Sequence, residues 1–218
     1  MSNTLPTLRR DQHLIGITGG IATGKSTVSG YLADTYHLPV LDADVYARDA
    51  VQSGSPILSK ILERYGAGIL LADNTLNRQR LGEIVFSNPA ELRWLEQQIH
   101  PLVRSCLQSE LNLLSEQYPT VVLVVPLLFE AGMTDLVTEI WVVYCERTQQ
   151  LQRLVKRLPS AVRGAQSRLT LEQATARINS QMPIEEKIAR ADVVIDNSST
   201  REALLKQVDA ALKTLEPF

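Results

Sequence analysis

The sequence has little cysteine and no long apolar run. Its two cysteines, Cys106 and Cys145, lack the paired spacing of a zinc site or a disulfide framework, so we interpret both as buried thiols in a reducing compartment. The longest apolar run, VVLVVPLLF, is far too short to cross a bilayer, and the stretch MSNTLPTLRRDQH has no signal-peptide core. We expect a cytoplasmic protein with no membrane partner.

The chain also lacks the excess of one charge that attracts nucleic acid. Its 22 basic and 24 acidic side chains give a formal charge of −2, so we expect small-molecule partners and no nucleic acid. The 218 residues, 44% of them hydrophobic, suffice for one globular domain with a sizeable core. The oligomeric state stays open, with a monomer favoured.

The charge is unevenly distributed along the chain. Residues 147–190 carry nine Lys or Arg and three Asp or Glu, whereas the remainder carries 13 basic and 21 acidic residues. A basic flap over an anionic ligand has this composition, and so does a solvated helical hairpin with incidental charge. Composition alone leaves the two interpretations even.

Short runs of β-branched residues alternate with longer stretches of helical spacing. The runs LIGIT, PVLD, VVLVV, IWVVY and VVI, which begin at residues 14, 39, 121, 140 and 193, predict strands. Helices are predicted over residues 27–35, 89–115, 148–157, 171–181 and 201–215. This alternation predicts an α/β fold with a parallel sheet that is covered on both faces.

The stretch GGIATGKST contains a complete G-x-x-x-x-G-K-[ST] motif between a predicted strand and a predicted helix. Glycines at three positions let successive amides point inward, and the following helix adds the positive end of its dipole. A plain glycine-rich turn would require neither Lys25, which can reach the β and γ phosphates, nor Ser26, whose hydroxyl can bind Mg²⁺. The predicted ATP-binding residues of this loop are Gly19, Gly20, Ile21, Ala22, Thr23, Gly24, Lys25, Ser26 and Thr27.

Two further absences narrow the class of nucleotide-binding protein. No N-K-x-D occurs, and no aspartate has a glycine three positions later, so the guanine and switch signals of GTPases are missing. The run VVLVV leads into PLLFE rather than into the Asp-Glu pair of motor and transporter ATPases. Another acid must therefore serve the metal and the acceptor.

Two carboxylates in the stretch LDADVYAR are candidates for that role. A short strand ending in Asp42 and Asp44 would place both acids at the carboxyl edge of the sheet, pointing the same way. One of them could accept a proton from an attacking hydroxyl, and either could hold magnesium through water. The alternative is that Asp44 only caps a helix that starts at Val45.

Taken together, six motifs resemble those of the dephospho-CoA kinase family over residues 14–212. In order they are GITGGIATGKST, LDADVYAR, LNRQRLGEIVF, IHPLVR, VVPLLFEAG and ARINSQMPIEEKIARADVVIDNS. The resemblance implies a three-layer α/β/α P-loop NTPase fold with a mostly parallel five-stranded sheet, a helical CoA-binding insertion and a helical lid. It divides the chain into a nucleotide-binding core (13–44, 119–146 and 191–218), a helical substrate-binding region (45–118) and a lid (147–190).

The resemblance also implies a reaction: transfer of the γ-phosphoryl group of ATP, with Mg²⁺, to the ribose 3′-hydroxyl of dephospho-CoA. It makes Asp44 the candidate base, with Lys25 and a lid arginine as further catalytic groups. The substrate-binding residues it implies are Asp42, Asp44, Arg78, His100 and Leu128. For His100 a structural role stays open, and the PLLFE apolar residues are either core or pocket lining.

Two assignments near the end of the chain depend on the same resemblance. Asn197, in VVIDNS, is placed near the adenine of ATP, although such residues also end strands for ordinary turn reasons. The stretch LPSAVRGAQS departs from the family pattern of the lid, so Arg157 is the first choice for the transition-state arginine, before Arg168 and Arg163. A P-loop kinase of another nucleoside or nucleotide, or a nucleotide-dependent switch protein, are the alternative functions.

Overall fold

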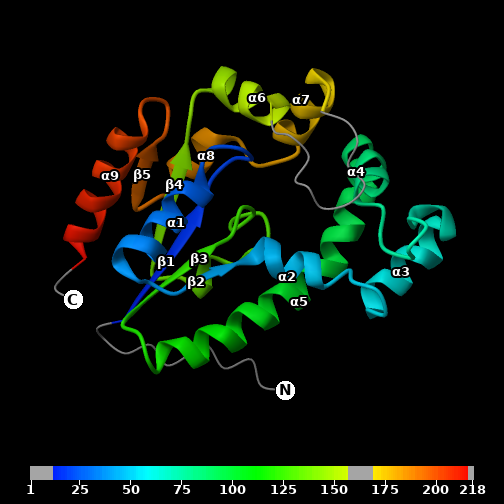
Figure 1. Cartoon of the computed structure of the whole chain (residues 1–218), viewed down its shortest axis with the longest axis horizontal. Helices are drawn as coiled ribbons and strands as arrows, with labels where there is room; N and C mark the ends of the chain where they lie inside the picture. Colours follow the sequence, from blue (N-terminus) through cyan, green and yellow to red (C-terminus); the bar gives the residue numbers. More distant parts are fainter. Residues whose placement is uncertain (1–11, 157–168, 216–218) are drawn as a thin grey trace.

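A parallel sheet forms the centre of the protein (Figure 1). The computed structural model describes residues 12–156 and 169–215, and within them five strands lie in the order β2-β3-β1-β4-β5. Each neighbouring pair is parallel. The strands are β1 (His13–Thr18), β2 (Val40–Asp42), β3 (Thr120–Val124), β4 (Glu139–Tyr144) and β5 (Val193–Asp196). The predicted parallel sheet is therefore confirmed.

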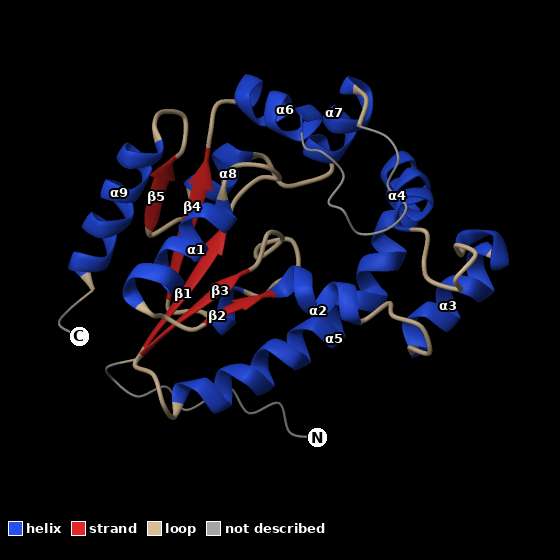
Figure 2. Cartoon of the chain, in the orientation of Figure 1, coloured by secondary structure: helices blue, strands red, loops and turns tan. Residues whose placement is uncertain are grey.

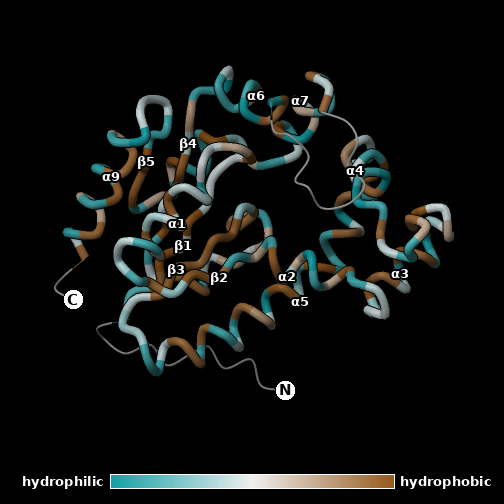
Figure 3. Tube along the Cα trace, viewed as in Figure 1, coloured by the Kyte–Doolittle hydropathy of each residue, from teal (hydrophilic) through white to brown (hydrophobic). Residues whose placement is uncertain are grey.

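Helices cover both faces of this sheet, which gives the three layers expected (Figure 2). Side chains alternate along a strand, so Ile15 and Ile17 of β1 pack on one face and Leu14 on the other. On the first face lie α1 (Lys25–Tyr36) and α9 (Arg201–Thr214), and on the second lies α5 (Pro89–Ser115). Figure 3 shows the result as apolar strands surrounded by helices with polar outer turns.

The strand order positions the ligand site. Strand β1 lies between β3 and β4, and the chain leaves β1 through the glycine-rich loop into α1. Connections from the two sides of β1 diverge here, which opens a crevice at the carboxyl ends of the strands, where open α/β folds bind ligands. The glycine-rich loop therefore lies at the edge of the sheet that the sequence predicted.

A second group of helices, between β2 and β3, has an apolar core of its own. It is formed by α3 (Pro56–Tyr65), the short η1 (Ala67–Ile69), α4 (Arg78–Ser87) and the first half of α5, with Ala50 and Val51 of the segment after α2. Helix α2 (Ala43–Asp49) itself packs with the cluster of α5 and β3. Arg64 donates to the carboxylate of Glu91 through its Nε and one Nη atom, and its guanidinium lies 4.6 Å above the ring of Trp94, which ties α3 to the start of α5. These helices extend to one side of the sheet (Figure 1).

Three helices of the basic segment lie next to the glycine-rich loop. They are α6 (Arg147–Lys156), α7 (Leu171–Asn179) and α8 (Ile184–Ile188). Leu154, Ala174 and Ile178 form a small apolar cluster that also includes Ile21 and Ala22 of the loop. Within the described part of the chain, no helix combines the length and hydrophobicity that crossing a bilayer requires.

Candidate active site

The loop between β1 and α1 has a backbone that only glycine can adopt at two positions. Gly19 has a φ of 139°, and a β-carbon there would meet the carbonyl oxygen of Val143 at 2.1 Å. Gly24 has a φ of 105°, and its β-carbon would meet the side-chain nitrogen of Asn197 at 2.1 Å. The glycines of the motif therefore serve close approach as well as positive φ.

Lys25 and Ser26 open helix α1 at the end of this loop. Gly24 is the N-cap residue and offers no side-chain cap, so the first amides of the helix can face an anion. The ammonium of Lys25 donates to the carbonyl oxygens of Gly19 and Gly20, at 3.0 and 2.8 Å, and so lies over the loop. Ser26 is exposed. The geometry suits phosphate oxygens above the loop.

The two aspartates of LDADVYAR have different roles, which corrects our expectation. Strand β2 ends at Asp42, whose carboxylate accepts the backbone N–H of Asp44 at 2.9 Å and caps α2. Asp44 therefore lies in the first turn of a helix rather than in extended backbone, so the two side chains do not share the direction we predicted. Asp44 is exposed and lines a pocket, whereas Asp42 does not line it.

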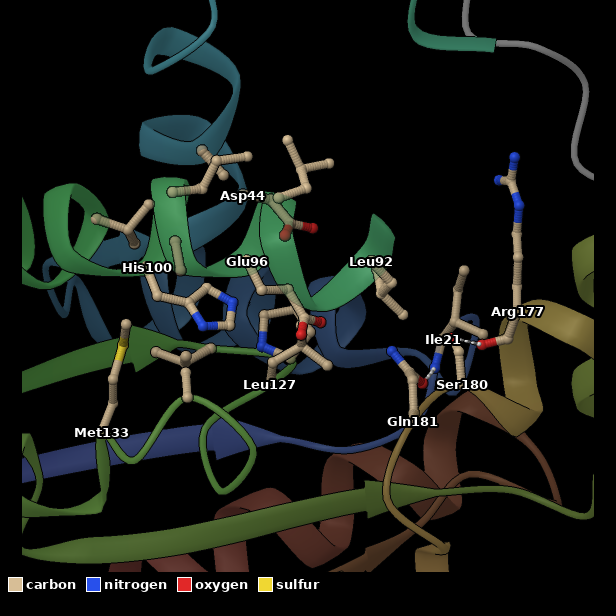
Figure 4. A pocket seen from close by; sticks show the side chains of 18 of the residues that line it. Ile21, Asp44, Leu92, Glu96, His100, Leu127, Met133, Arg177, Ser180 and Gln181 are labelled. Carbon is tan, nitrogen blue, oxygen red and sulfur yellow. Dashed lines mark hydrogen bonds between the residues drawn. The ribbon is translucent and has the colours of Figure 1, made fainter. Parts of the chain in front are cut away.

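This central pocket, with a volume of about 240 Å³, lies between the glycine-rich loop and the helices of the second group. Figure 4 shows Asp44, Glu96 and His100 on one side of it and Ile21, Arg177 and Gln181 on the other. Most other lining groups are apolar: Ala43, Ala47, Phe86, Leu92, Leu95, Ile99, Val103, Val125, Pro126, Leu127, Ala131 and Met133. A largely apolar pocket with a few polar groups is the usual form of a small-molecule site.

A second pocket continues the first toward α4. It has a volume of about 290 Å³ and shares Asp44, Ala47 and Phe86 with the central pocket. Arg78 lines its far part and donates to the backbone oxygen of Arg48 at 2.9 Å. The two pockets therefore form a groove that begins beside the glycine-rich loop and ends at a pair of arginines. Such a groove fits an extended acceptor that carries negative charge.

Burial shifts the protonation of several side chains that line this groove. It lowers the pKa of His100, although the nearby Glu130 opposes this shift. Burial raises the pKa of Glu96, and the charge of Glu130 adds to the increase. Burial likewise lowers the pKa of Arg177, whose guanidinium lies 5.0 Å above the ring of Phe86. Titratable groups perturbed in this way are common at functional sites.

Besides Asp42, a second predicted substrate-binding residue does not line the groove. Leu128 is completely buried in the core beneath the sheet, and the neighbouring Leu127 lines the central pocket instead. The loop after β3 turns at Val125, where the amide of Leu128 donates to the carbonyl oxygen of Val125, so adjacent leucines face opposite directions. Sequence letters alone do not specify which of the two faces inward.

Asn197 contacts the glycine-rich loop. Its side-chain amide donates to the carbonyl oxygen of Thr23 at 2.7 Å, and its backbone oxygen accepts from Arg153 of α6. Asn197 therefore supports the loop directly, whereas its placement near adenine stays a prediction. The candidate transition-state arginines, Arg157, Arg163 and Arg168, lie outside the described residues.

Sequence analysis missed several side chains around the loop. Gln181 accepts from the backbone N–H of Ile21, Gln150 donates to the carbonyl oxygen of Ile21, and Lys187 is fully buried against Glu130. Gln181 belongs to the ARINSQ stretch that opens the last of the six motifs, and the sequence assigned it no role beyond membership of the lid. Nothing in the local pattern of IEEKI indicates a buried lysine, because a five-residue helix is too short to show a clear apolar face.

Comparison with known proteins agrees with this geometry. The family model described as dephospho-CoA kinase matches residues 13–202. The dephospho-CoA kinase of Trichormus variabilis is 59% identical over 202 residues, which cover 92% of this chain and 97% of the relative.

Two solved structures are also similar over nearly the whole chain. A Thermus thermophilus protein is 34% identical, with a TM-score of 0.71 and coverage of 94% of this chain and 99% of its own. The dephospho-CoA kinase from Campylobacter jejuni is 27% identical, with a TM-score of 0.65 and coverage of 93% and 96%. The fold, the site and these matches lead to one conclusion: the chain belongs to the dephospho-CoA kinase family.

Proposed function

We propose that this site transfers the γ-phosphoryl group of ATP to the ribose 3′-hydroxyl of dephospho-CoA, which yields CoA and ADP. The observation that carries the proposal is that Ile21 of the glycine-rich loop and Asp44 of α2 line the same pocket. The loop that would bind the phosphate donor and a carboxylate that could accept a proton therefore line the same pocket. Family membership names the reaction, and this juxtaposition supplies a place for it.

In this proposal the loop and the start of α1 hold the triphosphate. Their amides replace part of the hydration of the phosphate oxygens, and the dipole of α1 favours negative charge. The ammonium of Lys25 is already held over the loop by hydrogen bonds to two carbonyl oxygens. When ATP binds, a phosphate oxygen can replace these oxygens as the acceptor. Charge that develops during transfer is then stabilised by groups that are in place beforehand.

Asp44 is the proposed general base. Its place in the first turn of α2 brings an exposed carboxylate to the wall of the central pocket, where an acceptor hydroxyl would lie. A carboxylate within hydrogen-bond reach of the hydroxyl can take its proton as the new bond to phosphorus forms. Asp42 is tied to the backbone of the same turn and fixes the position of Asp44.

The residues of the site fit Mg²⁺ as the metal. No group of three or more His, Cys, Asp or Glu side chains that could hold a metal occurs among the described residues. Mg²⁺ does not require one, because it keeps several waters and binds mainly through substrate phosphates. The exposed hydroxyl of Ser26 would hold the ion directly, and Asp44 would contribute through water. When bound, the ion neutralises charge on the β and γ phosphates.

The groove is the proposed site of the CoA precursor. Its apolar walls suit an extended organic chain, and Arg78 and Arg177 provide positive charge for the phosphates. His100 borders the central pocket as a mainly neutral polar group, since burial lowers its pKa. We further propose that the protein works as a monomer in the cytoplasm and does not bind nucleic acid, in keeping with its balanced charge and its two free cysteines.

Mass detection of the product tests the proposal. The purified chain is incubated with ATP, Mg²⁺ and dephospho-CoA, and in parallel with a panel of nucleosides and nucleotides. The expected result is a product heavier by one phosphate from dephospho-CoA and equimolar ADP. Phosphorylation of another acceptor only would indicate a different P-loop kinase. ADP release that is independent of any acceptor would indicate a switch protein instead.

A further inference from the structure

The backbone of Ile21, in the glycine-rich loop, is held at both its N–H and its carbonyl oxygen by side-chain amides. Its N–H donates to the Oε1 atom of Gln181 at 2.8 Å (Figure 4). Its carbonyl oxygen accepts from the Nε2 atom of Gln150, also at 2.8 Å. The two glutamines are far apart in the sequence, since Gln150 lies in α6 and Gln181 follows α7. Two separate parts of the basic segment, α6 and the turn after α7, therefore contact the backbone of the same loop residue.

Gln181 is itself anchored to the core. The next residue, Met182, donates its backbone N–H to the carboxylate of Glu130 at 2.9 Å. That carboxylate is paired at 2.8 Å with the ammonium of Lys187, whose side chain is fully buried and also donates to the carbonyl oxygen of Pro126. The segment that carries Gln181 is thus fixed to the loop after β3. Its amide is held in place before any ligand binds.

Gln150 is anchored in a similar way on the other side. It is only 8% exposed and lies so close to the loop that a β-carbon on Gly20 would meet its Nε2 atom at 2.5 Å. The helix that carries it is tied to the end of β5, because Arg153 donates to the carbonyl oxygen of Asn197 and Gln149 to that of Ser198, each at 2.8 Å. Rigid supports on both sides leave the backbone of Ile21 little freedom.

We propose that Gln150 and Gln181 are positioning residues for phosphoryl transfer, which clamp the backbone of Ile21 on both sides of its Cα and so fix the acceptor-facing end of the phosphate loop. The inference rests on the proposed function. Ile21 lines the central pocket together with Asp44, whereas the amides that open α1 lie at the other end of the loop. The clamp therefore controls alignment of donor and acceptor more than retention of ATP. Small misplacements of reacting groups are costly to rate.

Methionine replacements test the clamp, because they keep side-chain length but remove the hydrogen bonds. Gln150→Met and Gln181→Met should each lower kcat about tenfold, while the KM for ATP stays within about threefold of the parent. The kcat of the double variant should fall by less than the product of the two single losses, since both side chains hold the backbone of the same residue. Rates are compared well below the melting temperature of each variant.

Gln173→Met is the matched control. Gln173 closes the capping box at the start of α7 with Thr170 and does not bind the loop, so its replacement weakens the same helix without touching the clamp. Its kcat should stay within about twofold of the parent. The clamp is refuted if the kcat of both glutamine variants matches that of this control. It is also refuted if these variants keep the parental kcat and differ only by a higher KM for ATP. The parent is assayed first: a parent that makes no CoA overturns the proposed function, whereas active clamp variants overturn only the clamp.

Discussion

The buried ion pair of Lys187 and Glu130 predicts an asymmetric response to mutation. Glu130→Gln keeps an acceptor for the N–H of Met182 but removes the counter-charge of a lysine that is 0% exposed. Because this replacement leaves a buried lysine without its counter-charge, it should lower the free energy of unfolding by about 3–5 kcal/mol. Lys187→Met leaves a carboxylate that is 20% exposed and still accepts from the N–H of Met182, so the free energy of unfolding should fall by only about 1–2 kcal/mol.

Urea unfolding at constant pH measures both losses, provided that the slope with denaturant is unchanged. The double variant should be less destabilised than the sum of the single variants by more than about 1 kcal/mol, because the second replacement removes a group that the first left unpaired. The exposed pair Lys206 and Glu202, whose side chains are 74% and 77% exposed, is the control. Lys206→Met should change stability by less than about 0.5 kcal/mol.

Two results would refute this reasoning. One is a Lys187→Met variant that is destabilised as much as Glu130→Gln or more, since the exposed fraction of the carboxylate would then not govern the cost. The other is a loss in both variants that matches the surface control. Either result would mean that the pair is solvated in solution.

Three further predictions follow from the site and from the helices beside it. Asp44→Asn should lower kcat by about 10²-fold or more while the KM for ATP stays within about threefold, as measured in the CoA-forming assay; unchanged turnover would leave Asp44 as a helix residue only. Gly24→Ala should abolish measurable ATP binding in calorimetry, because the residue has a φ of 105° and its β-carbon would lie 2.1 Å from a side-chain nitrogen. The control Gly30→Ala, with open space around the new carbon, should bind ATP normally. The Arg64 guanidinium lowers the pKa of Glu91 to about 2, so the stability from this pair is fully present above pH 4.5 and is lost as the pH falls toward 2. Urea midpoints of the parent should therefore fall more steeply over that range than those of Arg64→Met, and parallel curves would contradict the pairing.

Much of the fold could be predicted because its signals are local. Runs of β-branched residues located the strands to within about a residue or two, and a continuous helical pattern predicted α5 with both of its ends. Pro101 lies inside that helix without ending it. The shorter helices α2, α3, α4 and α8 were not located individually. Their lengths of five to ten residues give too little periodicity, and α3 and α4 bury their apolar faces against one another and α5 rather than against the sheet.

The phosphate loop was predictable for the same reason, since the strand, glycines, lysine and helix are contiguous. The wrong prediction was that Asp42 and Asp44 both lie in extended backbone and point the same way. It arose because the stretch carries two competing local signals, one for a strand and one for a helix cap. The cap won because an aspartate can bind the amide two residues ahead and start a helix at once. Leu128 was predicted to line the pocket, but Leu127 does so instead. Which of the two faces the pocket depends on the turn of the loop after β3, and an irregular loop has no periodicity from which to predict it.

The sequence by itself determined the parallel α/β architecture, the phosphate loop and the family, because each depends on residues that are neighbours or lie in a fixed order. Only the tertiary structure decided which carboxylate reaches the pocket and which amides hold the loop. Gln150 and Gln181 meet Ile21 across separations of 129 and 160 residues, and Lys187 meets Glu130 across 57. Contacts of this kind arise when the packed sheet and helices bring distant segments together, so they have no local signature.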